Sequence, residues 1–343
     1  MRNKQISFFL IFLVLLPTGI FYSCDSDRSG LKPSTGKTNE IVVVTNSETL
    51  WKGRVGSEIS SFFGNYQEGL PQPEKIFDLA HVPESGFSQM FKTHHNIFIL
   101  DINPKFLSPV IETREDFWAK PQRIIKMTVA DEKTFFTEFD LRKEAFMDLF
   151  NSNERRRAVL AFGTIRDVNI QNQLKSTFDI DLMIPKSFMV AAIDDDFVWL
   201  RREAQNFSQG LLVYFYPYTD TLAFEPDQII NLRNHYTKAK VLGPLDGSFM
   251  KVSMVEPPMV RRINFNDNFA VEMRGLWELE GDFMGGPFIN YTMVDQRKNR
   301  VVTIDGYVYH PNKEKKDLLR QLEALIFTLS FPEDRREESA TVR

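Results

Sequence analysis

The sequence predicts an α+β protein, with an N-terminal α/β layer followed by an antiparallel sheet packed with helices. Residues 41–45 (IVVVT) form an apolar, β-branched run, and residues 48–63 then space their apolar side chains as a helix does. From residue 178 onward, short strand-like segments succeed one another with polar breaks, which is typical of an antiparallel sheet. Together these patterns predict a layered body built in two parts.

The first part contains two further predicted strands and a long helix. Residues 69–74 (GLPQPE) are a turn-rich break, after which residues 96–102 (NIFILDI) and 123–129 follow the pattern of buried strands. Residues 132–150 carry a helical stripe of phenylalanines, and we expect helix to continue in pieces to about residue 178.

The second part is predicted to alternate groups of strands with single helices. A helix opens at Pro226, where the missing N–H of proline costs nothing. The apolar residues of the closing helix, 312–329, fall on one stripe and should pack on the sheet. The predicted strands are residues 178–185 (FDIDLMIP), 188–194, 197–203, 211–218, 270–280, 287–295 and 300–310.

An export signal begins the chain. Arg2 and Lys4 supply a positive start, and the apolar run of residues 6–16 is followed by Pro17. This run is shorter than the roughly 20 residues of a membrane-spanning helix, so we expect residues 1–23 to be removed as a signal peptide.

Cys24 directly follows the small residue Ser23 and is the only cysteine of the chain, so it can form no internal disulfide. We expect Cys24 to become the lipid-bearing first residue of the mature protein, because acyl chains hold a protein on a membrane. An ordinary secretory signal that happens to end near a cysteine is the alternative. Phe21 and Tyr22 replace the usual small or aliphatic residues, which leaves the cleavage site open.

The expected divisions follow from composition. Residues 25–39 are too polar to fold alone, and the end of the chain is strongly charged. Loss of residues 1–23 changes the net charge from −4 to −6, which argues against binding of nucleic acid. The predicted segments are a signal peptide (1–23), a flexible tether (24–39), an α/β domain (40–153), an antiparallel sheet with helices (154–331) and a disordered tail (332–343).

Four stretches resemble a family of Bacteroidetes envelope lipoproteins defined only as a domain of unknown function: FVWLRRE (197–203), YFYPYTDT (214–221), MRGLWELEGDFMGGPF (273–288) and DGYVYHP (305–311). The resemblance covers the mature chain and implies a lipidated protein of the cell envelope at the outer membrane, facing the periplasm or the cell surface. It implies no reaction. The order of elements in residues 170–331 is similar to the sandwich of PsbP-like proteins, an architectural likeness that carries little weight for function.

Several acidic residues are candidates for chemistry. Glu278, Glu280 and Asp282 alternate along a predicted strand, which places neighbouring carboxylates about 7 Å apart, within the range of paired acid and base groups. Alternation along a solvated strand face gives the same pattern. Asp305 completes the candidate set, and Asp194-Asp195-Asp196 lacks the calcium-loop pattern and is predicted to form a polar hairpin turn.

Other motifs have simple structural readings. His94-His95 would point to opposite faces of a strand, so we expect no metal there, and no cofactor fingerprint or nucleophile motif is present. Arg155-Arg156-Arg157 is either a phosphate clamp at a helix start or bend or, more simply, a solvated face. Gly285-Gly286-Pro287 is predicted to make a tight turn or bulge. Asp220-Thr221-Leu222 resembles the O-glycosylation sequon of exported Bacteroidetes proteins, with an unmodified loop as the alternative.

Two functional hypotheses remain. The first is a non-catalytic envelope lipoprotein, held to the membrane at Cys24, that binds or supports another envelope protein. The second is a hydrolase of envelope glycan or peptide that uses the candidate carboxylates. A deep cleft gathering two of them would favour the hydrolase, and a flat apolar patch beside the 277–288 strand would favour binding. The contact aromatics would be Trp199, Tyr214, Tyr216, Tyr218 and Trp277.

Overall fold

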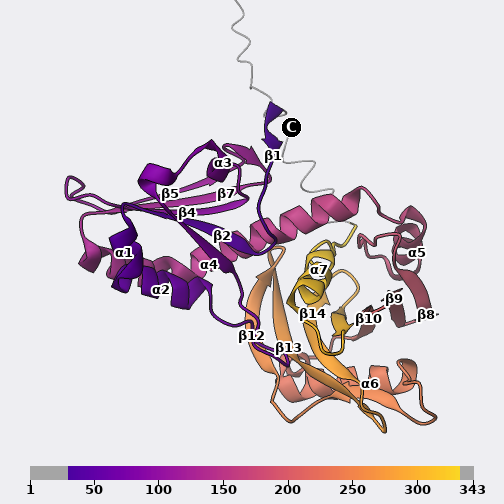
Figure 1. Ribbon diagram of the computed structural model, residues 1–343. Helices are drawn as coiled ribbons and strands as arrows, with labels where there is room; N and C mark the ends of the chain where they lie inside the picture. The colour runs from indigo at the N-terminus through magenta and orange to yellow at the C-terminus, as the bar shows by residue number, and fades with distance from the viewer. Residues whose placement is uncertain (1–29, 333–343) are drawn as a thin grey trace, which may run out of the picture.

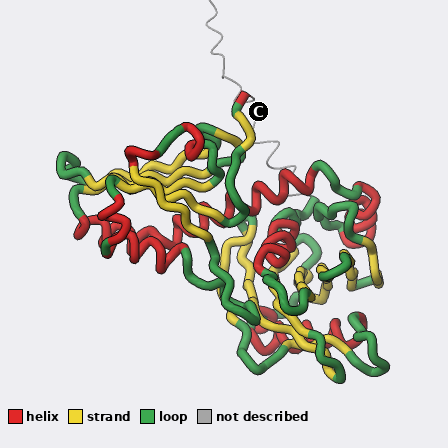
Figure 2. The backbone as a smooth tube through the Cα atoms, viewed as in Figure 1, coloured by secondary structure: helices red, strands yellow, loops and turns green. Residues whose placement is uncertain are grey.

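The computed structural model describes residues 30–332, whose strands gather in two main sheets (Figures 1 and 2). Helices and mixed sheets confirm the predicted α+β class. The predicted signal peptide and Cys24 lie outside the described residues, as does the tail beyond Pro332. No helix among the described residues is long and apolar enough to cross a membrane.

The first sheet has the strand order β3-β2-β4-β7-β5, with β5 antiparallel at one edge and the other four strands parallel. The predicted strands at 41–45, 96–102 and 123–129 are confirmed as β2, β4 and β7. β3 and β5 escaped prediction because both lie at sheet edges and carry polar side chains. The bounds are β2 (Glu40–Thr45), β3 (Asp78–Pro83), β4 (Asn96–Ile102), β5 (Val110–Glu115) and β7 (Arg123–Val129).

Helices α1 (Glu48–Lys52), α2 (Arg54–Phe63) and α4 (Glu132–Gly163) cover one face of this sheet with a phenylalanine-rich core. The opposite face is covered only by η2 (Glu84–Gly86), the four-residue α3 (Gln89–Lys92) and neighbouring loops. The helix predicted at 48–63 is broken because Gly53 is extended, with its N–H donating to the Leu50 carbonyl.

The 32-residue helix α4 links the two sheets. The Asp131 carboxylate caps it by accepting from the Thr134 N–H. It runs beneath the first sheet and on toward the second (Figure 1), so it crosses residue 153, where composition predicted a boundary. Arg155, Arg156 and Arg157 therefore lie within an unbroken helix and not at a helix start or bend.

The second sheet is antiparallel, in the order β11-β13-β14-β15-β10-β9-β8, and β12 pairs with β13 on the same side as β11. Helices α5 (Val168–Phe178) and α7 (Lys316–Ile326) pack on one face, and α6 (Pro226–Lys240) packs on the other. The strand bounds are β8 (Met189–Asp194), β9 (Phe197–Glu203), β10 (Ser208–Pro217), β11 (Phe249–Val252), β12 (Met259–Phe265), β13 (Asn268–Glu280), β14 (Gly285–Asp295) and β15 (Arg300–Tyr309).

The strand predicted at residues 178–185 is wrong. Ile180, Leu182 and Ile184 are buried in alternation, which produces a strand-like pattern. Their backbone nevertheless makes only isolated bridges, such as that between Asp181 and Ser330, because no neighbouring strand runs alongside.

The segment predicted as the end of a flexible tether packs on the first sheet. β1 (Lys32–Pro33) pairs in parallel with β6 (Ala119–Lys120). The Lys37 carbonyl contacts the His95 ring at Nε2, 2.6 Å away, and Asn39 is buried. Composition missed this docking because the partners of these polar residues lie some 60 residues or more along the chain.

Candidate functional site

The structure separates the candidate carboxylates. Glu278 and Glu280 form ion pairs with Lys251 of β11, and Asp282 lies in the turn beyond β13. Glu278 and Asp282 line an open hollow of about 580 Å³ that Glu280 and Asp305 do not line. Asp305 is fully buried on the α6 face of the sheet, where it accepts from Arg233 Nε at 2.9 Å. No deep cleft among the described residues gathers these four groups.

The candidate contact aromatics belong mainly to the core. Tyr214 and Trp277 are at most 2% exposed, and Trp199 and Tyr216 pack against the same cluster. The Trp277 indole N–H donates to the Val308 carbonyl at 3.2 Å. The exposed aromatics here are instead Phe283, in the turn between β13 and β14, and Phe269, at the start of β13.

The remaining motifs find local partners. Asp194 pairs with Lys240, and Asp196 accepts from the Tyr236 hydroxyl at 3.0 Å, at the predicted hairpin between β8 and β9. Thr221 is exposed at the start of η3 (Thr221–Phe224).

Gly285 and Gly286 lie within β14, so the predicted turn or bulge is wrong. A Cβ on Gly286 would lie 2.1 Å from the Val308 carbonyl oxygen, and this close strand approach is what requires glycine.

The histidine pair holds the N-terminal segment. His95 is buried against the Lys37 carbonyl, and His94 lies 3.6 Å from Glu40. Among residues 30–332, no group of three or more side chains is placed to hold a metal ion.

A groove of about 940 Å³ with buried charges lies between the two sheets, and we call it the central groove. The loop at residues 65–68 and helix α4 form one wall, and β12, β13 and α7 form the other. Charges of both signs line it: Arg155, Arg261, Arg262, Arg274, Arg320, Glu68, Glu144, Asp148, Glu272 and Glu323.

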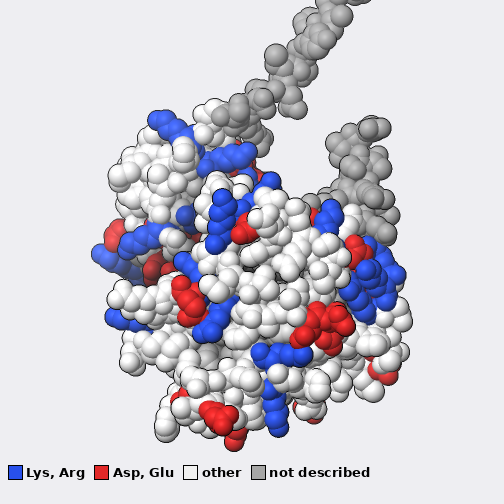
Figure 3. All heavy atoms as spheres, turned by 90° about the vertical axis from the view of Figure 1, so that its right-hand side faces the viewer, with Lys and Arg blue, Asp and Glu red and all other residues white. Residues whose placement is uncertain are grey.

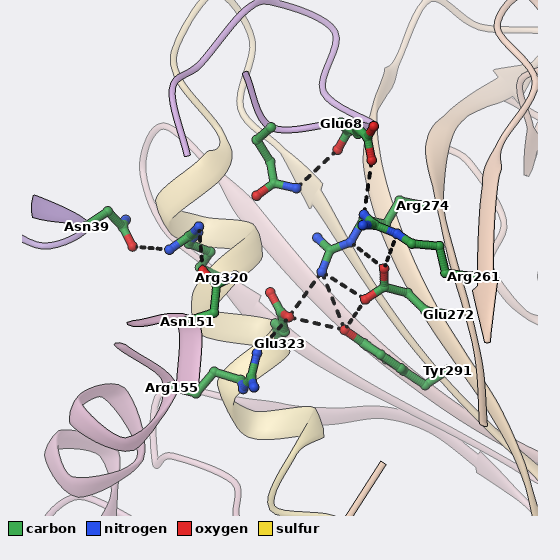
Figure 4. A network of polar contacts seen from close by, with 11 residues as sticks. Asn39, Glu68, Asn151, Arg155, Arg261, Glu272, Arg274, Tyr291, Arg320 and Glu323 are labelled. Atoms are coloured by element: carbon green, nitrogen blue, oxygen red, sulfur yellow. Dashed lines mark hydrogen bonds and ion pairs between the residues drawn. The ribbon is translucent and has the colours of Figure 1, made fainter. Parts of the chain in front are cut away.

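A buried ion network forms the floor of the central groove (Figure 4). Arg274 of β13 donates from Nη2 to Glu323 of α7 at 3.0 Å, and its Nε lies 3.0 Å from Glu272. The Tyr291 hydroxyl donates to Glu272 at 2.8 Å. Arg155 of α4 reaches Glu323 at 3.5 Å, so the network joins the two halves of the chain.

The neighbouring arginines keep the floor carboxylates ionised. Burial alone would raise the pKa of Glu323, but the charges of Arg274, Arg155 and Arg320 lower it to about 2. The pKa of Glu272 is also lowered, because Arg274 outweighs burial. The floor therefore presents fixed charges at neutral pH, and burial raises the pKa of the Tyr291 hydroxyl so that it remains a neutral donor.

A second set of bonds fixes the groove walls to each other. Arg320 of α7 donates to Asn151 of α4 at 3.1 Å and also to the Asn39 side-chain oxygen (Figure 4). Asn39 in turn donates to Asp317 at 2.6 Å. The docked N-terminal segment, α4 and α7 are thus tied together at one end of the groove.

Arg262 on one wall and Asp148 on the other are, like Glu144, in no ion pair among the described residues. Arg262 of β12 is exposed, and Asp148 of α4 faces the groove. Partial burial and the charge of Glu272 raise the pKa of Asp148, against the opposing charges of Arg155 and Arg261. These two groups are available to a bound molecule, whereas the floor ions satisfy one another.

Sequence reasoning missed this groove for an identifiable reason. Glu323 interrupts the apolar stripe of the closing helix, and Glu272 with Arg274 places opposite charges two residues apart in a strand. Both patterns indicate a polar surface. That these surfaces of β13 and α7 meet α4 depends on how the two sheets pack, which the local sequence does not show.

Models of two domain families match the chain. Residues 34–162 match a domain of unknown function, DUF8532, and residues 167–328 match a domain of unknown function, DUF4837. The sequence resemblance suggested one family over the mature chain, whereas two models divide it between α4 and α5. No curated protein matches the chain.

Two solved structures are similar over part of the chain. They are a point mutant of protein Mog1, at 10% identity, and the Ran-binding protein Mog1p of Saccharomyces cerevisiae, at 9%. Each match covers 45% of this chain and 90% of the other, with a TM-score of 0.29, and we base no argument on it. The chain is thus similar, over residues 34–162 and 167–328, to two domain families whose function is unknown.

Proposed function

We propose that the protein is a lipid-anchored component of the cell envelope, attached to the outer membrane through Cys24, that binds an extended segment of an envelope protein in the central groove. The apolar leader ending at Cys24 supports the anchor. The matches to families of unknown function are compatible with this role and add no reaction.

The observation that carries the proposal is the free edge of β12. Among the described residues β12 pairs only with β13, through a two-residue turn at Asn266 and Asp267, both with positive φ. In such a hairpin the residues flanking the turn share hydrogen bonds, so alternate residues point outward. The outward N–H and C=O groups belong to Val260, Arg262 and Asn264.

This edge lies along the groove. Residues 261–264 line it without a gap, so the backbone edge, and not only one side-chain face, borders the space. Three outward residues match a partner strand of about five residues, roughly 17 Å long. Adding a strand to a free edge satisfies the backbone of both chains, which is a recurring mode of peptide recognition.

The walls suggest the chemistry of that segment. An acidic side chain of the peptide would meet Arg262, and a basic one on the opposite side would meet Asp148 or Glu144 of α4. The floor network offers little to an incoming charge, because its own ions are paired. We therefore favour an extended peptide with charges of both signs.

The docked N-terminal segment limits the reach of the anchor. Residues 32–33 are already paired with β6, so only residues 25–31 separate Cys24 from the body. At about 3.6 Å per residue, even a fully extended link would span no more than roughly 29 Å. The point where the N-terminal segment joins the body would therefore lie within that distance of the membrane.

The anchor is tested with Cys24→Ala. The native protein should fractionate with outer membranes and carry a diacylglycerol-modified N-terminal cysteine by mass spectrometry, whereas the variant should be released. A native protein without lipid, or a variant that stays in the membrane pellet, would contradict the anchor.

The groove is tested by removing one outward donor. Asn264→Pro deletes an N–H that points away from β13, so the hairpin should remain folded. Asn264→Ala is the matched control. An envelope protein should copurify in stoichiometric amount with the native protein and the alanine variant, and be lost with the proline variant.

Amide hydrogen exchange on the purified complex distinguishes strand pairing from other contacts. The amides of Val260, Arg262 and Asn264 should exchange more slowly when the partner is bound. Retention of the partner by Asn264→Pro, or unchanged exchange at these amides, would rule out the edge as the binding element.

A further inference from the structure

A second hollow lies on the open face of the first sheet. Strand β2 leads through α1 and α2 on one face to β3, and β3 leads through η2 and α3 on the other face to β4. From its own carboxyl end, β4 leads to β5 at the other edge of the sheet, so the connections that leave the adjacent strands β2 and β4 run in opposite directions. Open α/β sheets bind ligands in the crevice at such a switch point.

The structure has a pocket of about 260 Å³ at this place. Val44, Ile99 and Ile124 from three neighbouring strands form an apolar floor. Phe87 and Trp118, whose rings meet edge to face at 5.8 Å, form a side wall. The volume is slightly below the range of pockets for drug-sized ligands, so it suits a molecule with one ring system.

Charges lie on the side of the pocket where the strands end. In the sheet register, Ile99 is opposite Lys126, and Asp101 follows two residues after Ile99 on β4. Lys126 and Asp101 are therefore diagonal neighbours on one face. Arg114 pairs with Glu112 at 2.6 Å, and Lys126 is in no ion pair among residues 30–332.

Lys126 is unusual at its position. Two of its neighbours, Ile124 along β7 and Ile99 across on β4, are apolar and partly or fully buried. Its neighbour on the other side is Glu112 of β5, which already pairs with Arg114. Asp101 uses one oxygen to accept from Asn46 at 3.1 Å, which leaves the other for a ligand. Besides the Arg114–Glu112 pair and Glu84, the pocket thus combines an apolar floor with a cationic and an anionic group, Lys126 and Asp101, that are diagonal neighbours on the sheet.

We propose that this pocket binds a small zwitterion with a flat apolar side chain, that is, an aromatic amino acid. The ring would lie on Val44, Ile99 and Ile124 beside Trp118. The carboxylate would meet Lys126, and the ammonium would meet Asp101. An aromatic residue at the end of a peptide shares the ring and one of the two charges. It is the alternative ligand that the experiment must separate from the free amino acid.

Calorimetric titration of the full-length protein in detergent tests the site, with L-tryptophan as the probe. N-acetyl-L-tryptophan represents a C-terminal residue, and L-tryptophanamide represents an N-terminal one. We expect L-tryptophan to bind at least tenfold more tightly than either derivative. If one derivative binds as tightly as L-tryptophan or more tightly, the pocket binds the end of a peptide, and the proposal of a free amino acid as ligand is overturned.

Two variants locate the binding. Lys126→Met keeps the aliphatic stem and should weaken L-tryptophan at least tenfold without weakening L-tryptophanamide. Ile99→Phe should fill the floor and abolish binding of all three probes. Lys105→Met, at an exposed lysine of the same half, is the control and should change nothing.

Several results would overturn the proposal. They are no heat from L-tryptophan at about 1 mM, unchanged affinity in Lys126→Met, or tighter binding of the uncharged sugar glucose than of L-tryptophan. Thermal melts of Ile99→Phe establish that it is folded. If that variant unfolds, the unequal response of the two tryptophan derivatives to Lys126→Met decides the question.

Discussion

Two ion clusters lie on opposite faces of the second sheet, and they differ in their surroundings. Arg233 and Asp305 are both 0% exposed and are sealed beneath α6, with the guanidinium 4.1 Å from the centroid of the Phe288 ring. Glu272 and Arg274 point to the other face, toward Glu323 of α7, and all three line the central groove. The first cluster is internal to one core, whereas the second also joins two parts of the chain.

The comparison shows how alternation in a strand divides the roles of neighbouring residues. Met273 is directly opposite Asn290, which belongs to the Asp305 cluster, while Arg274 points to the other face. On the face shown in Figure 3, acidic and basic side chains both lie on the outer surface, among uncharged residues. The face of the sheet to which a residue points, and not its type, therefore decides which of the two clusters it joins.

The largest effect is expected for Arg233→Met. It leaves the Asp305 carboxylate buried without its ion partner, which should lower the free energy of unfolding by about 3–5 kcal/mol. Urea denaturation measures this loss. The double variant Arg233→Met/Asp305→Leu should recover part of it, because the unpaired charge is gone. A loss under about 1 kcal/mol in the single variant would contradict a sealed pair.

Glu323→Gln should have an intermediate, pH-dependent effect. The pKa of Glu323 is lowered from 4.5 to about 2, so its ionised form stabilises the fold fully above about pH 4.5. This contribution is lost as the pH falls toward 2. The free energies of unfolding of the native protein and the variant, measured by urea denaturation, should therefore differ by about 2–3 kcal/mol at pH 6 and converge near pH 2.

The pH series also sharpens the comparison between the clusters. If the difference in free energy of unfolding between the native protein and Glu323→Gln stays constant from pH 6 to pH 2, the charge of the Glu323 carboxylate does not stabilise the floor of the groove. Arg155→Met removes only the ion pair between α4 and Glu323. It should therefore lower the free energy of unfolding with the same pH dependence but by a smaller amount.

The smallest effect is expected for Glu278→Gln. Glu278 and Lys251 form an exposed pair at 3.3 Å, and such pairs contribute little because water screens them. The free energy of unfolding should change by no more than about 0.5 kcal/mol. A change comparable to that of Glu323→Gln would show that burial does not determine how much each carboxylate contributes to the free energy of unfolding.

Local patterns predicted much of the fold. β2, β4 and β7 are apolar runs that need no knowledge of their neighbours, and the strands β9, β13, β14 and β15 were recognisable from alternation. Edge strands such as β3 and β12 were missed because their residues are polar and partly exposed. Residues 178–185 were overpredicted because burial in alternation does not require a strand partner.

The site was much less predictable. Glu278 and Asp282 were singled out from spacing, and they line only an open hollow. Glu272, Arg274 and Tyr291 belong to the consecutive strands β13 and β14, whereas Glu323 and Arg155 come from α7 and α4, and no local signal brings these helices to them. The switch-point pocket likewise requires the strand order, which places Lys126 beside Ile99.

The sequence alone determined the α+β class, the central parallel strands and the expectation of a lipidated Cys24, because periodicity and short motifs are local properties. Tertiary structure decided that residues 32–39 dock, that α4 bridges the sheets, and that oppositely charged residues meet in the central groove. Those outcomes depend on contacts between residues far apart in the chain. Burial gives such contacts their energy, and only the folded arrangement decides which groups are buried together.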